Sequence, residues 1–249
     1  PLVVEKIFKG KVMPTLNKPL MKVLLSIPFL NNIIYGSVRK KLVNTFGGFL
    51  EHGLIVGGAA INEKVEKLMR RMKFPYTVGY GMTECAPLIS YAPWTKSKEG
   101  ASGQILDTMQ VRIDSDDPYS IAGEIQVRGE NVMSGYYKNV EATKDSFTED
   151  GWFKTGDLGK LDSENYLYLA GRAKNMIVTE GGKNVFPEEI ENAFQLFTDI
   201  EQITVQGYIM DEATKSEGIE ALIYPAEDLF KRLNVMRNTP ESVDPVYSA

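Results

Sequence analysis

The sequence has little cysteine, little histidine and no excess of positive charge. One cysteine in 249 residues excludes an internal disulfide framework and is typical of a reducing compartment. His52 is the only histidine, so a thiol nucleophile paired with an imidazole base is not expected, and we interpret Cys85 as structural. The net charge of -5, with acidic and basic residues interleaved, predicts no nucleic-acid partner and favours small-molecule ligands.

A long apolar run is also absent. The most apolar stretch, Leu20–Tyr35, is interrupted by Pro28 and by a pair of asparagines, whereas a membrane-spanning helix needs roughly 20 apolar residues. We predict two core-packed helices on either side of Pro28. A peripheral lipid contact or the wall of an acyl channel remains the alternative, because basic residues flank the stretch: Lys18, Lys22, Arg39, Lys40 and Lys41.

The remaining composition, 43% hydrophobic and 24% charged, is sufficient for a sizeable core in one or two domains. No signal peptide precedes the first expected element, which predicts a cytoplasmic protein. The start at Pro1 predicts that the chain is a piece of a longer protein.

From residue 49 onward the pattern alternates between strand and helix. Leu54–Val56 is predicted to be a buried strand that ends at a glycine pair, and Asn62 is a suitable N-cap for a helix over Glu63–Met72. A second strand is predicted over Tyr76–Tyr80. This order predicts parallel pairing, with ligands gathering beyond the carboxyl ends of the strands.

A different pattern, strands separated by glycine turns, covers residues 103–171. Strands are expected at Gln110–Ile113, Gly123–Arg128 and Tyr166–Ala170, which predicts a β-rich subdomain. The acidic run Asp114–Pro118 lacks the ligand spacing of a calcium loop and is interpreted as a solvated turn.

The segment after the second strand carries groups suited to a nucleotide. Thr83 offers a hydroxyl to a phosphate oxygen, and Glu84 offers a carboxylate to a magnesium ion that bridges phosphates. Gly79 and Gly81 permit a close backbone approach, and Tyr80 has an aromatic face on which adenine could stack. Taken alone, the segment also fits a glycine-flanked strand end with a surface acid.

Two later residues are suited to ribose and phosphate. Asp157 is expected in a Thr-Gly-Asp turn, where its carboxylate could accept hydrogen bonds from both ribose hydroxyls. Arg172 has a permanently charged fork of donors that suits the ribose and the α-phosphate. A solvated turn aspartate is the alternative for Asp157.

Four blocks in this order, Tyr80–Glu84, Lys154–Leu158, Gly171–Lys174 and Gly182–Glu191, resemble the nucleotide site of the acyl-adenylate-forming enzymes. This superfamily includes acyl-CoA synthetases, peptide-synthetase adenylation domains and beetle luciferases, and the resemblance covers roughly residues 50 to 225. It implies catalytic roles for Thr83, Glu84, Arg172 and Lys174, with Glu84 as the magnesium ligand. It also implies a nucleotide-binding set: Gly58, Ala59, Gly79, Tyr80, Gly81, Met82, Thr83, Asp157 and Arg172.

The resemblance further implies two domains in an α/β fold. Residues 1–171 would be part of the large adenylate-forming domain, with 1–102 as its α/β part and 103–171 as its β-rich part. Residues 172–249 would be an incomplete C-terminal lid that swings about Lys174. In the lid we expect a helix from Pro187 and strands at Gln202–Ile209 and Ile219–Tyr224. The expected buried face of the helix consists of Ile190, Ala193, Phe194 and Phe197.

Two elements of the family are missing from the sequence. There is no Ser/Thr/Gly-rich loop ending in lysine, which grips the ATP phosphates, and no late Gly-Lys motif; Gly182-Lys183 belongs to the loop after the hinge. The chain alone is therefore predicted to be inactive.

Within the superfamily, Val4–Phe8, Phe46–Phe49 and Gly182–Pro187 look like long-chain fatty acyl-CoA synthetases. The resemblance thus implies an AMP-forming ligase whose intact form uses a fatty acid, ATP, Mg²⁺ and coenzyme A. Two alternatives remain: acyl or amino-acid adenylation for transfer to a carrier protein, and a non-catalytic nucleotide-binding module. Intact Thr83, Glu84, Asp157 and Arg172 argue against the second.

Overall fold

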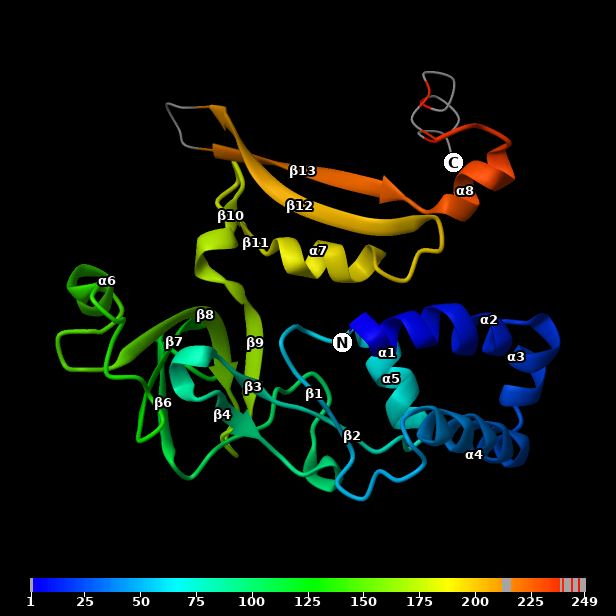
Figure 1. The fold of residues 1–249 in the computed structure, drawn as a ribbon, viewed down its shortest axis with the longest axis horizontal. Coiled ribbons are helices and arrows are strands. Elements are labelled where there is room, and N and C mark those ends of the chain that lie inside the picture. The colour runs from blue at the N-terminus through cyan, green and yellow to red at the C-terminus, as the bar shows by residue number, and fades with distance from the viewer. Residues whose placement is uncertain (1, 212–215, 238, 240–242, 244–245, 247–249) are drawn as a thin grey trace. The chain divides into compact units, whose positions relative to one another are not determined.

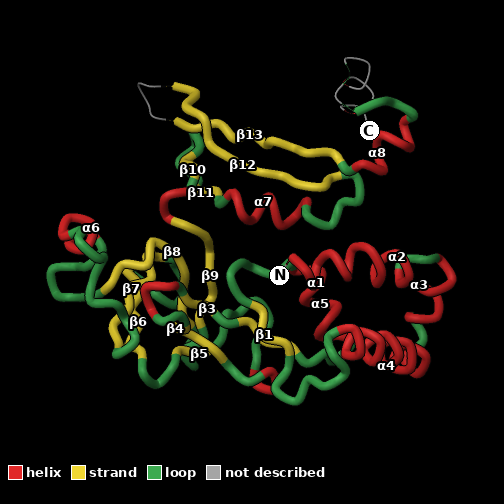
Figure 2. Tube along the Cα trace, viewed as in Figure 1, coloured by secondary structure: helices red, strands yellow, loops and turns green. Residues whose placement is uncertain are grey.

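The computed structural model describes residues 2–211, 216–237, 239, 243 and 246 and divides into two compact units, Pro1–Lys174 and Asn175–Ala249 (Figure 1). We describe each unit by itself. The division falls close to the boundary predicted between residues 171 and 172, and the assignment of the units to a large domain and a lid stays a prediction. Both units combine helices with strands, so the fold is mixed α/β, as the sequence predicted (Figure 2).

The first unit begins with four helices, and two more follow later in the chain. They are α1 Leu2–Ile7, α2 Met13–Leu16, α3 Pro19–Leu25, α4 Pro28–Thr45, α5 Glu63–Arg71 and α6 Val140–Asp145, with a π-helical turn at Phe8–Val12 and 3-10 turns at Thr83–Cys85 and Trp94–Lys96. The strands are β1 Leu54–Val56, β2 Tyr76–Val78, β3 Tyr80–Gly81, β4 Leu88–Tyr91, β5 Gln104–Ile105, β6 Met109–Asp114, β7 Gly123–Gly129, β8 Phe153–Leu161 and β9 Leu167–Arg172. A further 3-10 turn, Ala173–Asn175, follows β9.

These strands form three small sheets. β1 and β2 pair in parallel with Leu54 opposite Tyr76, which confirms the parallel pairing expected from the strand, helix, strand order. β3, β4 and β5 form an antiparallel sheet, and β6 to β9 form an antiparallel meander in chain order. The core of the β-rich part contains side chains from β7, β8 and β9, including fully buried Ile125, Phe153 and Leu167. This apolar core fixes the position of the polar residues that alternate with it.

The helix that joins β1 and β2 begins where the sequence predicted. The Asn62 side chain accepts hydrogen bonds from the backbone N–H groups of Lys64 and Val65, at 3.0 and 3.4 Å, which satisfies two donors that the first turn leaves free. Val65 and Met69 are fully buried on one face of α5. The Asn62 N–H in turn donates to Glu5 Oε1 at 2.9 Å, which ties α1 to the start of α5.

The expectation of core-packed helices around Pro28 is half right. Helices lie on both sides of Pro28, and Tyr35 and Leu42 of α4 are buried. Other apolar side chains of the two helices are exposed, with Leu20 at 71% and Phe29 at 74%. Apolar composition predicts burial only where another element covers the helix, and over this face the described residues provide none. No single described helix is long and apolar enough to cross a membrane; α3 and α4 together pass a test of length and composition, but they are bent by 115°.

The second unit contains two antiparallel sheets of two strands each, together with short helices. Its elements are β10 Ile177–Val178, β11 Asn184–Val185, α7 Pro187–Phe194, β12 Ile200–Asp211, β13 Ser216–Pro225 and α8 Glu227–Leu233. The helix from Pro187 and both predicted strands are confirmed. The predicted buried face of the helix is wrong for Ala193, Phe194 and Phe197, which are exposed. The helix ends at Phe194, and the two phenylalanine rings pack against each other, 5.4 Å between centroids, rather than under a sheet.

Candidate functional site

The glycine-rich segments predicted to bind the nucleotide lie together at the carboxyl ends of β1 and β2. The Gly79 N–H donates to the carbonyl of Val56 at 3.0 Å, which places the loop of Gly58 and Ala59 beside the start of β3. Glycine is required at position 81 because a Cβ there would collide with the carbonyl oxygen of Pro87. At Gly81 the missing side chain thus makes room for the chain's own backbone, whereas a Cβ at Gly58 would meet no atom within 4 Å.

Thr83 and Glu84 lie on a tight 3-10 turn directly after β3. Met82 N–H donates to the Pro87 carbonyl at 2.7 Å, and the left-handed Ala86, with a φ of 51°, closes the turn. The Glu84 carboxylate accepts a hydrogen bond at 3.0 Å from the hydroxyl of Tyr136, a residue that the sequence analysis did not identify. Burial, and then this contact with Glu84, raise the pKa of the Tyr136 phenol, so it remains a donor at neutral pH.

The structure corrects the predicted surroundings of Asp157. This residue lies inside β8, not in a turn between elements, and it pairs directly with Arg172 on β9. Thr155, Gly156 and Asp157 lie opposite Ile125 alone, so the Thr-Gly-Asp sequence forms a bulge. Gly156 adopts the left-handed φ of 71° that such a bulge accommodates most easily with glycine.

Side-chain hydrogen bonds hold this bulge. The Thr155 hydroxyl donates to the Ile125 carbonyl at 2.8 Å, and the Asp157 N–H donates back to Thr155 Oγ1 at 3.1 Å. Both groups are buried, so leaving either one unpaired would be costly. Thr155 is therefore a positioning residue for Asp157, and the alternation of inward positions through Phe153, Thr155 and Asp157 was the sequence signal for it.

The carboxylate of Asp157 joins segments that are far apart in the sequence. Tyr80 Oη donates to Asp157 Oδ2 at 2.8 Å, and Arg172 Nε lies 3.2 Å from Asp157 Oδ1. Burial, and then the negative charge of Asp157, raise the pKa of the Tyr80 phenol, which keeps the hydroxyl protonated and donating. The Arg172 side chain is 64% exposed, so the rest of its guanidinium faces solvent.

The burial of Tyr80 is at odds with the predicted stacking of adenine on its ring. The residue is only 7% exposed and packs in the same core as Ile89 and Val127. Its hydroxyl, rather than its face, reaches the site. Lys174 is exposed on the 3-10 turn Ala173–Asn175, and its predicted role as a hinge stays a prediction.

The surroundings of Cys85 and Glu84 bear on two of the predictions from the sequence. The Cys85 side chain is fully buried, as expected of a structural cysteine. Among the described residues no group of three or more His, Cys, Asp or Glu side chains could hold a metal ion by itself. The carboxylate of Glu84 instead fits Mg²⁺ that is shared with phosphates, since this ion is usually bound through one or two carboxylates and retains other oxygen ligands.

Comparison with known proteins places this arrangement in a family. A family model described as AMP-binding enzyme matches residues 12–137, just over half of the chain. The chain therefore belongs to the AMP-binding enzyme family.

The individual relatives are CoA ligases that are named for different carboxylic acids. The indoleacetate–CoA ligase of Aromatoleum aromaticum is 35% identical over 70% of this chain and 34% of its own length. The long-chain-fatty-acid–CoA ligase FadD15 of Mycobacterium bovis is 36% identical over 68% of this chain and 27% of its own. This chain spans about a third of the length of the curated relatives that it matches.

Among solved structures, O-succinylbenzoate coenzyme A synthetase of Bacillus subtilis, in complex with ATP and magnesium ion, matches with a TM-score of 0.61. It is 29% identical, and the match covers 77% of this chain and 38% of that one. The predicted fold class is confirmed by this likeness. The long-chain specificity is not, because relatives named for other acids are equally similar.

Proposed function

We propose that this chain supplies the nucleotide-binding part of an AMP-forming acyl-CoA ligase. The observation that carries the proposal is the contact of Tyr80, Asp157 and Arg172 beside the turn of Thr83 and Glu84. Each carboxylate oxygen of Asp157 has one protein partner, and a carboxylate offers about four acceptor positions, so two remain for the hydroxyls of a ribose. The geometry therefore suits a nucleotide.

The charged groups at the site have complementary roles. Arg172 uses Nε toward Asp157 and keeps further donors for the α-phosphate. Thr83 offers its hydroxyl to a phosphate oxygen, and Glu84, oriented by Tyr136, holds Mg²⁺. Bound Mg²⁺ would neutralise negative charge on the phosphates.

The reaction that we propose for the intact protein requires no general base. A fatty carboxylate is already a nucleophile; it attacks the α-phosphorus of ATP, and pyrophosphate leaves. The thiol of coenzyme A then displaces AMP from the acyl-adenylate. The contribution of this chain is to align the ribose and α-phosphate and to stabilise charge at Arg172 and Glu84. The predicted inactivity of the chain alone and the peripheral membrane contact stay predictions.

For the acyl substrate we propose a long-chain fatty acid. The Val4–Phe8 and Phe46–Phe49 segments and the similarity to a long-chain-fatty-acid–CoA ligase support it. Rates of AMP release by the intact protein with palmitate, indoleacetate and 2-succinylbenzoate test the proposal. We expect palmitate to give the highest kcat/KM. A higher kcat/KM for either aromatic acid would reject a long-chain fatty acid as the substrate, but it would still support an acyl-CoA ligase.

Calorimetric titration of the 249-residue chain with ATP and with 2′,3′-dideoxy-ATP tests the nucleotide site. Hydrogen bonds to a charged group contribute about 1.5–3 kcal/mol each, so we expect the parent to prefer ATP by about tenfold or more. Asp157→Ala should lose most of this preference, and Asp157→Asn, which keeps the side-chain volume, should lose part of it. Circular dichroism of both variants checks that they remain folded.

The matched control is Asp145→Ala, which removes an exposed aspartate on α6. Its affinity for ATP should stay within about threefold of the parent, as expected for a solvated surface position. An undiminished preference in Asp157→Ala would mean that the ribose is held elsewhere. Absence of any saturable ATP binding by the parent chain would refute the nucleotide site in this chain.

A further inference from the structure

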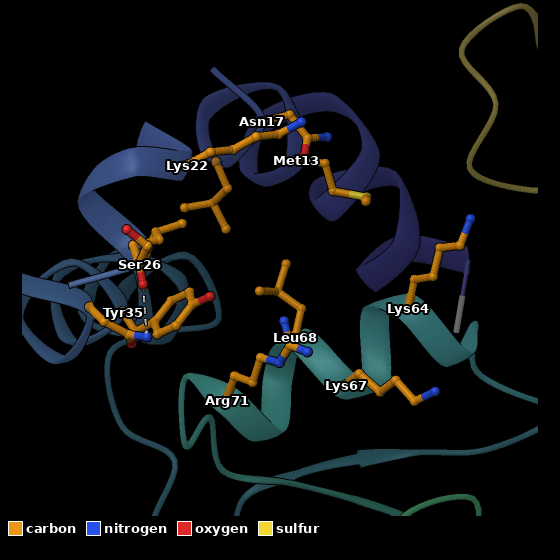
Figure 3. Close-up of a pocket in the computed structure, with 12 residues that line it drawn as sticks. Met13, Asn17, Lys22, Ser26, Tyr35, Lys64, Lys67, Leu68 and Arg71 are labelled. Carbon is orange, nitrogen blue, oxygen red and sulfur yellow. Dashed lines mark hydrogen bonds between the residues drawn. The ribbon is translucent and has the colours of Figure 1, made fainter. Parts of the chain in front are cut away.

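The first unit has a pocket that the nucleotide residues do not line. It lies between the N-terminal helices and α5 and has a volume of about 810 Å³ (Figure 3). Pockets that bind small molecules in proteins typically have volumes of about 300–1,000 Å³. The pocket is therefore large enough for a ligand of its own.

Apolar side chains from four helices form the interior of this pocket. Leu16 of α2 and Tyr35 of α4 are buried, and Met13, Leu25 and Leu68 are half-buried around them. In Figure 3 the side chains of Leu68 and Tyr35 point into the space between the helices. Such a lining favours an apolar group, since each CH₂ removed from water contributes about 0.8 kcal/mol.

Basic side chains lie around the apolar interior. Lys64, Lys67 and Arg71 lie on one face of α5, because residues three and four apart are neighbours on a helix, and Lys22 approaches from α3. Lys67 forms an ion pair with Glu63, whereas Lys22, Lys64 and Arg71 form none with a described carboxylate. Among the residues that the structure describes, none that lines the pocket is acidic.

The charge of the surrounding sequence has the same sign. Residues 6–50 contain eight lysines and arginines and no aspartate or glutamate, although the whole chain has a net charge of -5. The interleaving of charges expected from the overall composition therefore does not extend to this segment. A local excess of positive charge raises the concentration of anions near the pocket and opposes the approach of cations.

We propose that this pocket binds a single-chain amphiphile with an anionic head group. The alkyl chain would lie among Leu16, Leu25 and Leu68, and the head group would lie beside Lys64 and Arg71. A carboxylate and a phosphate monoester share the required chemistry, so a fatty acid and a single-chain phospholipid are the two sources. This site involves none of the predicted nucleotide-binding residues, and the proposal does not depend on the ligase assignment.

The test is calorimetric titration of the 249-residue chain, without nucleotide and at low ionic strength, with three amphiphiles below their micellar concentrations. Dodecanoate and dodecyl phosphate carry an anionic head, and dodecyltrimethylammonium carries a cationic head on the same chain. We expect at least one anion to bind at one site per chain and at least tenfold more tightly than the cation. The tighter anion identifies the source. Failure of both anions to saturate, or equal binding of the cation, would overturn the proposal.

Two variants locate the binding. Lys64→Glu combined with Arg71→Glu should weaken binding of the anion at least tenfold, and Leu68→Trp, which fills the pocket without changing the charge, should weaken binding of both anions. The control combines Lys144→Glu with Lys160→Glu, two exposed positions outside the pocket that change the net charge equally. An equal loss in this control, or unchanged binding in Leu68→Trp, would reject the pocket as the site. ATP affinity of the folded variants should stay within about threefold of the parent.

Discussion

Asp157 is a buried carboxylate whose partners are in place without a ligand. Tyr80 donates to one oxygen, and Arg172 lies beside the other. If one of these contacts broke, the carboxylate would stay buried with its desolvation less fully compensated. The two contacts therefore hold the carboxylate in one orientation. A carboxylate held in this way would lose little further freedom on accepting two hydroxyls, which supports the ribose contact that we propose for Asp157.

Cys85, next to Glu84, gives a pH-dependent prediction. Burial, and then the charge of Glu84, raise the pKa of the thiol from 9.0 to about 11. Because the pKa is higher in the folded state, the associated stability is complete below about pH 9 and is lost as the pH rises toward 11. We expect the parent to lose about 2 kcal/mol relative to Cys85→Ala between pH 8 and pH 10.5.

Urea denaturation of both proteins at several pH values measures this difference. The cavity left by the alanine shifts the whole curve of the variant, so the change in the difference with pH is the relevant quantity. Parallel curves across this range would show that the thiol titrates in the folded protein as it does in the unfolded chain.

At the level of elements, short-range signals predicted α5 and the position of β1 correctly, but not their surroundings. Ile55 in the strand predicted to be buried is 57% exposed, and the strand predicted over Tyr76–Tyr80 ends at Val78. The Asn62 cap, the helical spacing of Val65 and Met69, and the glycines after β1 all act within a few residues. These features depend on local sterics and hydrogen bonds, which the sequence specifies directly.

β8 and the α3–α4 pair depend on contacts that the sequence does not specify locally. Thr155, Gly156 and Asp157 have the composition of a turn, but Thr155 hydrogen-bonds to β7 and holds them in a strand as a bulge. The apolar residues of α3 and α4 predicted burial, whereas burial requires a covering element elsewhere in space. The Tyr136 contact with Glu84 joins residues far apart in sequence, and no spacing rule predicts it.

The bulge in β8 gives a prediction about Gly156. A Cβ at this position would meet no atom within 4 Å, so the effect of Gly156→Ala comes from its left-handed backbone alone. We expect a loss of about 1–2 kcal/mol in the free energy of unfolding. ATP affinity should fall as well, because the bulge positions Asp157.

Gly36→Ala is the matched control, because Gly36 also has open space around its Cβ position but lies inside α4 without a positive φ. This variant should gain about 0.5–1 kcal/mol. Urea denaturation measures both variants. A Gly156→Ala protein as stable as the parent would show that the bulge does not require a left-handed residue.

At the scale of the whole molecule, the boundary between the two units comes just after the last residue that we assign to the nucleotide site. All of the assigned nucleotide residues belong to the first unit, and Arg172 is the last residue of β9. The division between the units comes directly after Lys174. If Lys174 is the hinge that the sequence predicts, a backbone change there would leave Asp157 and Arg172 paired, because both belong to the first unit.

This arrangement gives a prediction for Lys174→Pro in the intact protein. Proline fixes φ at its own position and disfavours the helical region at Ala173, so the 3-10 turn Ala173–Asn175 loses conformations that a hinge needs. We expect thioester formation from added acyl-adenylate to slow at least tenfold more than adenylation, measured by ATP–pyrophosphate exchange. Lys174→Ala, which removes the side chain and keeps the backbone free, should change the two half-reactions about equally. Equal losses in both half-reactions of Lys174→Pro would remove the hinge assignment, because a rotation between the two steps would then not depend on this residue.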